Sequence, residues 1–212
     1  MRRAPLSDSV AFLRRNPFFT RLVREHGTPD LKRGRDPFRA LVRAIVYQQV
    51  SGKAAASILA RFIALFPRKK FPTPDDVRRM PVRKLRGAGL SAQKASYVKD
   101  LAEKFLDGTV EYRTLHRMET DAVVGHLTQV RGVGVWTAHM FLIFTLNRPD
   151  VLPVGDLGIR KGFQIVYGLR TLPDAEKMEK LAKPWHAHAS AASWYLWRAA
   201  DGAKGERKER GK

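Results

Sequence analysis

The 212-residue sequence contains no cysteine. This absence excludes disulfides, a catalytic thiol, a thiolate zinc site and a cysteine-bound iron–sulfur cluster. Apolar runs of membrane-spanning length are also missing, and the first residues, MRRAPLSDSVAFLRR, lack the long apolar stretch of a signal peptide. We therefore expect a soluble, cytoplasmic protein without a membrane partner.

Acidic residues are scarce: 20 Asp and Glu stand against 40 Lys and Arg, which gives a net charge of +20. The last twelve residues, DGAKGERKERGK, contain five basic and three acidic residues, so they contribute +2 and the rest of the chain carries +18. An excess of this size over a folded body favours a polyanionic partner, most simply nucleic acid. A basic surface that only confers solubility is the alternative.

Strand patterns are absent as well, and almost every segment has helical periodicity. In DPFRALVRAIVYQQV, Asp36 followed by Pro37 predicts a helix start, with the apolar residues on one face. TPDD at 73–76 predicts another capped start, and SAQKASYVKDLAEKFLDG predicts a helix that stops at Gly108. Further helices are expected near 156–168, 174–184 and 188–200.

These patterns predict an all-α fold of about ten short helices. We expect residues 1–200 to form a single domain made of two helical lobes. One lobe would hold the middle of the chain, and the other would hold the N-terminal helices together with those after Asp156. The prediction for residues 201–212 is a basic, disordered tail.

The stretch LTQVRGVGVWTA contains two glycines, which stand between two helical segments. Gly132 and Gly134 permit a very tight turn, and they leave backbone N–H groups bare at the start of the next helix. Such amides suit a phosphate, and Arg131 adds a positive charge beside them. An ordinary tight turn between helices explains the glycines equally well.

A lone acid, Asp156, stands in VLPVGDLGIRKGF, immediately before an expected helix. Its position is that of a helix N-cap, and sequence physics alone favours this structural role. The cap's hydrogen bonds and the helix dipole stabilise an ionised carboxylate, so we expect Asp156 to stay negative. A negative group in a cleft suits a reaction that develops positive charge.

The run from Leu127 to Phe163 resembles the helix-hairpin-helix (HhH-GPD) DNA glycosylases, whose signature is a Gly-hydrophobic-Gly hairpin and a Pro-rich loop ending in a catalytic Asp. Within that superfamily it is most similar to the AlkA-like 3-methyladenine DNA glycosylase II group. AIVYQQVSGKAAASI, GLSAQKASYVKDLA and SWYLWRA extend the resemblance over roughly residues 36–200, in the expected order. The resemblance implies a helix-hairpin-helix motif and an active-site cleft between the two lobes.

The implied activity is that of a monofunctional DNA glycosylase in base excision repair, which flips an alkylated base out of duplex DNA and hydrolyses its N-glycosidic bond. Asp156 would be the catalytic residue, and it would either stabilise the cationic sugar or orient the attacking water. Relatives with lyase activity carry a lysine two residues after the second hairpin glycine. Trp136 occupies that position here, which predicts base release without strand cleavage.

The resemblance also indicates residues that contact the extruded base and the DNA. Trp136 is expected to stack on the base, although a core position is the alternative, and Trp197, Tyr47 and Trp194 are weaker candidates because such residues usually build cores. The expected DNA contacts are Arg131, Gly132, Val133, Gly134 and Thr137 at the hairpin, and Gln48, Gln49, Val50, Ser51 and Lys53 in the loop that enters the minor groove. Gln49 is polar where relatives often have an apolar wedge, so Val50 is the alternative wedge.

No cofactor is required for this hydrolysis. The resemblance implies a structural Na⁺ or K⁺ held by the backbone carbonyls of Thr128, Val130 and Val133. The expected partner is double-stranded DNA containing alkylated bases, bound by a monomer that is associated with the nucleoid if the protein is bacterial. Ala187 and Ala189 replace a Pro and an Arg of the relatives. The sequence therefore does not decide how that wall of the cleft is held or which damaged bases it admits.

Two other interpretations remain. A non-catalytic helix-hairpin-helix protein would grip phosphates and use Asp156 only as a cap. A glycosylase/lyase of the endonuclease III type is disfavoured by Trp136 and by the absence of cysteine. The sequence does not distinguish among 3-methyladenine, 7-methylguanine, 1-methyladenine and ethenoadenine.

Overall fold

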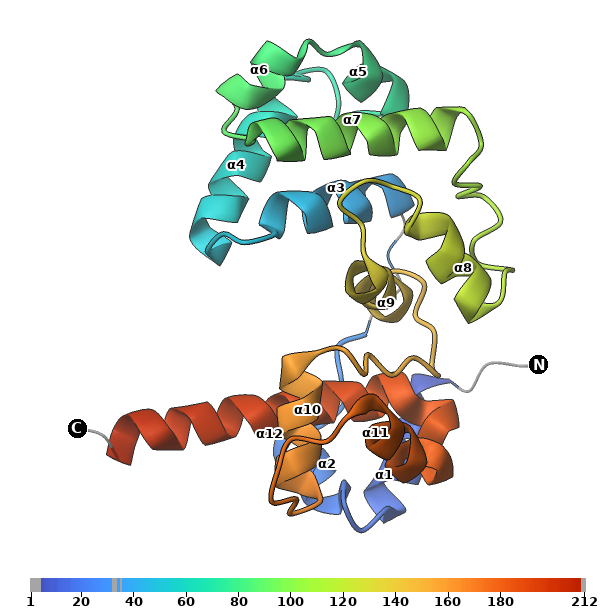
Figure 1. Cartoon of the computed structure of the whole chain (residues 1–212), viewed down its shortest axis with the longest axis vertical. Helices are drawn as coiled ribbons and strands as arrows, with labels where there is room; N and C mark the ends of the chain where they lie inside the picture. The colour runs from blue at the N-terminus through green and yellow to red at the C-terminus, as the bar shows by residue number, and fades with distance from the viewer. Residues whose placement is uncertain (1–4, 32–33, 35, 211–212) are drawn as a thin grey trace. The chain divides into compact units, whose positions relative to one another are not determined.

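The computed structural model describes residues 5–31, 34 and 36–210, without the side chains of 204–210, and that part of the chain is helical with no strand (Figure 1). The all-α prediction is therefore confirmed. The helices are α1 (Leu6–Arg15), α2 (Thr20–His26), α3 (Pro37–Tyr47), α4 (Gly52–Ala64), α5 (Pro74–Arg79), α6 (Val82–Gly87), α7 (Ala92–Leu106), α8 (Thr120–Leu127), α9 (Val135–Phe144), α10 (Leu157–Val166), α11 (Ala175–Ala182), the 3₁₀ helix η1 (Lys183–His188) and α12 (Ala189–Arg210).

The chain divides into two compact units. The first unit joins residues 1–32 to 142–212, and the second comprises residues 33–141. The division falls inside α9, whereas the sequence-based expectation placed it at Asp156. The cleft expected between the lobes stays a prediction.

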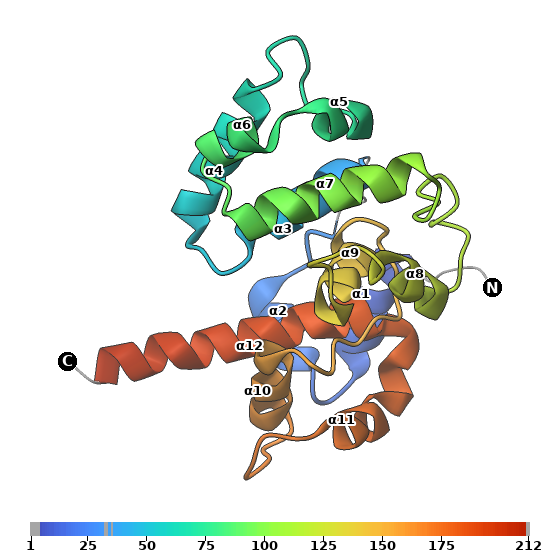
Figure 2. The ribbon, with the colours of Figure 1, turned by 45° about the horizontal axis from the view of Figure 1, so that its top comes forward.

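The second unit is built around α7, which lies between α3 and the pair α5 and α6 (Figures 1 and 2). The apolar stripes predicted for α3 and α7 are buried, because each stripe faces the neighbouring helix. For example, the rings of Phe38 on α3 and Phe105 on α7 meet edge to face at 5.3 Å. The buried residues of the two stripes are Phe38, Leu41, Val42, Ile45, Val46, Ala95, Val98, Leu101, Ala102 and Phe105.

Local capping fixes where these helices begin. The carboxylate of Asp36 accepts the N–H of Arg39 at 2.9 Å, with Pro37 in the first turn of α3. Thr73 and Asp76 form a reciprocal capping box at α5. Both starts were predicted from the sequence, because the side-chain acceptor and the amide that it caps lie only three residues apart.

The first unit places α10 across α12 (Figures 1 and 2). Gly162 on α10 allows this contact, since a Cβ there would lie 2.7 Å from the carbonyl carbon of Leu196 on α12. The core beside it contains Phe163 and Trp185. Tyr195 is also buried there; its hydroxyl donates to Gly27 O at 2.7 Å, and burial raises the pKa of Tyr195 to about 12.

The last helix is longer than the sequence pattern suggested. We expected a disordered tail over 201–212, but α12 continues to Arg210, and residues 211–212 lie outside the described part. Ala, Lys, Glu and Arg are good helix formers, so the composition permits the extension. Among the described residues, no helix is both long and apolar enough to cross a membrane.

Candidate active site

Asp156 caps α10, as the sequence predicted. Its Oδ1 accepts the backbone N–H of Ile159 at 2.8 Å, and the same oxygen accepts the indole N–H of Trp197 at 2.9 Å. The side chain is half-buried. A cap needs only the first of these bonds, so the bond from α12 is an additional constraint on the carboxylate.

Aromatic surface continues beside this pair. The ring of Phe144, at the end of α9, stacks on Trp197 with centroids 5.9 Å apart and planes inclined by 24°. Phe144 remains 42% exposed. A Cβ at Gly158 would lie 2.8 Å from Trp197 Cδ1 and 2.9 Å from Asp156 Oδ1. The glycine therefore leaves the space in which the indole reaches the carboxylate.

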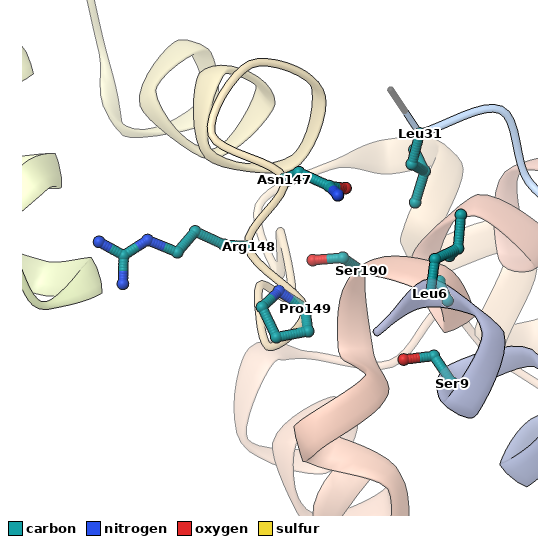
Figure 3. A pocket seen from close by; sticks show the side chains of 8 residues that line it. Leu6, Ser9, Leu31, Asn147, Arg148, Pro149 and Ser190 are labelled. Atoms are coloured by element: carbon teal, nitrogen blue, oxygen red, sulfur yellow. The ribbon is translucent and has the colours of Figure 1, made fainter. Parts of the chain in front are cut away.

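The loop that leads to Asp156 is attached to the start of α12. The N–H of Ser190 donates to Pro149 O at 2.8 Å, and its hydroxyl accepts the N–H of Val151 at 3.1 Å. Figure 3 shows the Ser190 hydroxyl pointing toward this loop and the Arg148 side chain extending to the other side of it; Ser190 and Pro149 both line a pocket of about 20 Å³. A space of this size holds about one water molecule. These bonds fix the path of the chain toward Asp156.

The predicted hairpin forms between α8 and α9. Gly132 adopts a φ of +82°, and a Cβ there would lie 2.6 Å from Tyr97 Cγ. Both the backbone angle and the close ring therefore require glycine. At Gly134 a Cβ would meet open space, so its backbone is reachable from outside.

Arg131 is paired with a carboxylate on α7. Its backbone N–H donates to Asp100 Oδ2 at 2.8 Å, and its Nε donates to Asp100 Oδ1 at 3.0 Å. The Arg131 side chain is 62% exposed, but the Asp100 side chain is only 12% exposed. The amide of Arg131 is thus not bare, and part of its positive charge is balanced within the protein.

The loop between α3 and α4 exposes Gln49, Val50 and Ser51. Gln49 has a φ of +54°, and Val50 is 39% exposed. Gln48 is half-buried instead, and its Nε2 donates to Gly132 O in the hairpin at 2.8 Å. Ser51 caps α4 by accepting the Ala54 N–H at 3.4 Å, while Lys53 is exposed in its first turn.

The remaining predicted residues lie in different surroundings. Trp136 is 50% exposed on α9, so it is not a core tryptophan, whereas Thr137 is buried. Tyr47 lies under the guanidinium of Arg43 at 4.3 Å. Trp194 makes its ring contacts with His26, Tyr195 and Arg198, and these contacts place it in the packing of the first unit.

The carbonyls proposed for a monovalent cation belong to the turn after α8. Thr128 caps the end of α8, and Val130 O accepts the N–H of Val133 at 3.0 Å. A carbonyl oxygen has a second lone pair, so the turn suits a cation by donor type. The Na⁺ or K⁺ site stays a prediction, and replacing both ions with tetramethylammonium at constant ionic strength would check it through duplex affinity.

Comparison with known proteins identifies the family. Residues 42–187 match the HhH-GPD superfamily of base excision DNA repair proteins. The DNA-3-methyladenine glycosylase 1 of Schizosaccharomyces pombe is 36% identical over 165 residues, which cover 77% of this chain and 72% of that protein.

The chain belongs to the HhH-GPD superfamily.

Solved structures of superfamily members share the fold of this glycosylase. The 3-methyladenine DNA glycosylase of S. pombe in complex with abasic DNA aligns with a TM-score of 0.76 at 33% identity, over 90% of this chain and 94% of that one. A DNA-3-methyladenine glycosidase from Bacillus halodurans aligns with a TM-score of 0.82 at 32% identity, over 93% and 89% of the two chains. The resemblance stated from the sequence is confirmed, and the protein is a base excision repair glycosylase that hydrolyses N-glycosidic bonds.

Several residues around these sites were missed by sequence reasoning. Phe144 ends an apolar helical run, and nothing in the run marks it as exposed. Tyr97 and Asp100 lie on α7, where periodicity predicted only a buried apolar face. An acidic residue beside that face was the one available signal for Asp100, because a buried carboxylate needs a partner.

Proposed function

We propose that this HhH-GPD glycosylase removes alkylated bases from double-stranded DNA, acting as a monomer in the cytoplasm, and that Asp156 is its catalytic residue. The observation that carries the proposal is the shared Oδ1 of Asp156, which accepts both the Ile159 N–H and the Trp197 indole N–H. Two donors from different helices hold the carboxylate in one orientation. Such pre-organisation is what electrostatic catalysis requires.

The chemistry follows from the charge that builds up on the sugar. As the N-glycosidic bond breaks, its electron pair leaves with the base and the deoxyribose gains oxocarbenium character. A carboxylate beside the sugar stabilises that cation, and water then adds to the anomeric carbon and loses a proton. The products are a free base and an abasic site.

Aromatic faces support an alkylated base as the substrate. Trp136 and Phe144 are both large and about half exposed. Alkylation on a ring nitrogen often leaves a base cationic, and a cation is attracted to an aromatic face. Relatives named DNA-3-methyladenine glycosylase point to the same class of substrate.

The identity of residue 136 supports simple hydrolysis. An indole cannot form a Schiff base with the sugar, so Trp136 offers no amine for covalent catalysis. We therefore expect base release without strand cleavage. Among the described residues, no group of His, Cys, Asp or Glu is arranged to hold a metal ion.

Incubation of the wild-type protein with a methylated duplex tests the proposal directly. Free base and alkali-labile sites should appear together, and no nicks should form before alkali is added. Nicking without alkali would show lyase activity. Duplex binding without base release, across 3-methyladenine, 7-methylguanine, 1-methyladenine and ethenoadenine, would favour the non-catalytic binding protein.

Removing the indole donor should slow base release. In Trp197→Phe an aromatic ring stays but the N–H bond to Asp156 is lost, so the single-turnover rate should fall about 10- to 100-fold, the value of one hydrogen bond to a charged group. Trp185→Phe is the matched control, because it also removes one indole N–H bond in the same unit, but the acceptor is the Tyr167 hydroxyl at 2.8 Å and not Asp156. Equal rates for the two variants would remove the indole bond from the mechanism.

A further inference from the structure

A side-chain bond joins two loops of the second unit that are far apart in the sequence. Gln48 Nε2 donates to Gly132 O at 2.8 Å, across 84 residues. Gln48 directly follows α3 as its C-cap, and Gly132 lies in the hairpin between α8 and α9. The bond therefore runs directly between the α3–α4 loop and the hairpin.

One face of α7 supports both loops. Lys94, Tyr97 and Asp100 are spaced three residues apart, so their side chains lie along one side of the helix. Lys94 Nζ donates to Val46 O at 2.7 Å, just before the α3–α4 loop, and desolvation lowers the pKa of Lys94. The other two side chains support the hairpin. The Tyr97 ring lies against Gly132, and the Asp100 carboxylate accepts hydrogen bonds from the backbone N–H and the Nε–H of Arg131.

The residue after Gln48 adopts an uncommon backbone conformation. Gln49 has a φ of +54°, which non-glycine residues seldom adopt and which neighbouring structure must hold in place. Its side chain and that of Val50 are exposed. The chain therefore turns at the residue that directly follows the bonded Gln48, and the two exposed residues come immediately after that bond.

We propose that Gln48 is a positioning residue, which holds Gln49 and Val50 at a set distance from the hairpin so that the two loops engage DNA as one rigid unit. The proposal rests on the proposed function, in which the hairpin binds phosphate and the α3–α4 loop occupies the space of the extruded nucleotide. A glutamine suits this task because its amide donates to a carbonyl. A carboxylate of the same length would repel that oxygen.

The test compares Gln48→Met with Gln48→Glu. Methionine keeps the length and removes the donor, while glutamate places a negative charge against Gly132 O. Gln164→Ala is the matched control, since that amide also donates to a backbone carbonyl, Arg170 O at 3.3 Å, in the first unit. Thermal melting shows that each variant is folded.

The first measurement uses the free protein. Hydrogen exchange should speed up over residues 48–51 and 131–134 together in Gln48→Met, and more so in Gln48→Glu, but not in Gln164→Ala. The second measurement uses duplexes with 2-aminopurine beside an alkylated base. We expect extrusion and single-turnover base release to slow about two- to tenfold in Gln48→Met, the effect of losing one hydrogen bond between uncharged groups.

The outcomes separate the possibilities. Unchanged exchange in either loop would overturn the proposal, because the bond would then not link them. Faster exchange with wild-type extrusion would overturn it as well, since Gln48 would be merely structural. If the wild type released no base, the proposed function would fail, and the 2-aminopurine signal would still decide whether Gln48 sets extrusion.

Discussion

Asp156→Asn is expected to lower kcat for base release by at least about 10²–10³-fold, the range found when one electrostatic group is removed from an active site. Stability should hardly change. Asparagine is as good an N-cap as aspartate, and its amide oxygen can accept the same bonds from Ile159 and Trp197. The substitution thus removes the negative charge while the geometry is kept. Single-turnover release from methylated duplex measures the loss.

Asp174→Asn is the matched control for this variant. Asp174 caps α11 by accepting the Lys177 N–H at 2.8 Å, so it shares the capping role of Asp156. It should release base at the wild-type rate. If Asp156→Asn did the same, Asp156 would be only a cap and the proposed mechanism would be wrong.

The second large effect is expected from Gly162→Ala, at the contact of α10 with α12. A Cβ there would lie 2.7 Å from the carbonyl carbon of Leu196, and a helix backbone cannot move aside as a flexible side chain can. Overpacking of this kind costs roughly 1–3 kcal/mol or more, which corresponds to a fall in Tm of about 2–12 °C for a chain of this size. Base release should fall too, because Asp156 starts α10 and Trp197 follows Leu196 on α12.

Gly125→Ala provides the comparison. Gly125 is exposed on α8, and a Cβ there would have no heavy atom within 4 Å. Alanine in a helix interior is favoured over glycine by up to about 1 kcal/mol, so Tm should stay the same or rise. A Gly162→Ala protein that melted like Gly125→Ala would show that α10 and α12 can separate without cost.

How much the sequence predicts depends on the distance over which an interaction acts. The starts of α3 and α5 were predicted because Asp36 and Thr73 cap amides three residues away. The buried stripe of α7 was predicted because helical periodicity places its apolar residues on one face. The extent of α12 was not, since composition alone does not say where a favourable helix ends.

The hairpin contains both a feature that the sequence predicted and a contact that only the packing of helices decided. Its two glycines predicted a tight turn, and Gly132 indeed has a positive φ. The sequence also placed the positive charge of Arg131 beside the turn. It gave no sign that Asp100 accepts both the backbone N–H and the Nε–H of Arg131, because this pairing depends on α7 passing beside the turn and on a buried carboxylate needing donors.

Alone, the sequence determined the helical fold class, the caps at Asp36 and Thr73, the excess positive charge and the place of Asp156 at the start of α10. Only the tertiary structure decided which distant residues are hydrogen-bonded. The pairs are Trp197 with Asp156, 41 residues apart, Arg131 with Asp100, 31 apart, and Gln48 with Gly132, 84 apart. The physical reason is the distance along the chain over which each kind of interaction acts. Periodicity and capping act within about one or two helical turns, whereas these partners are set by how whole helices pack.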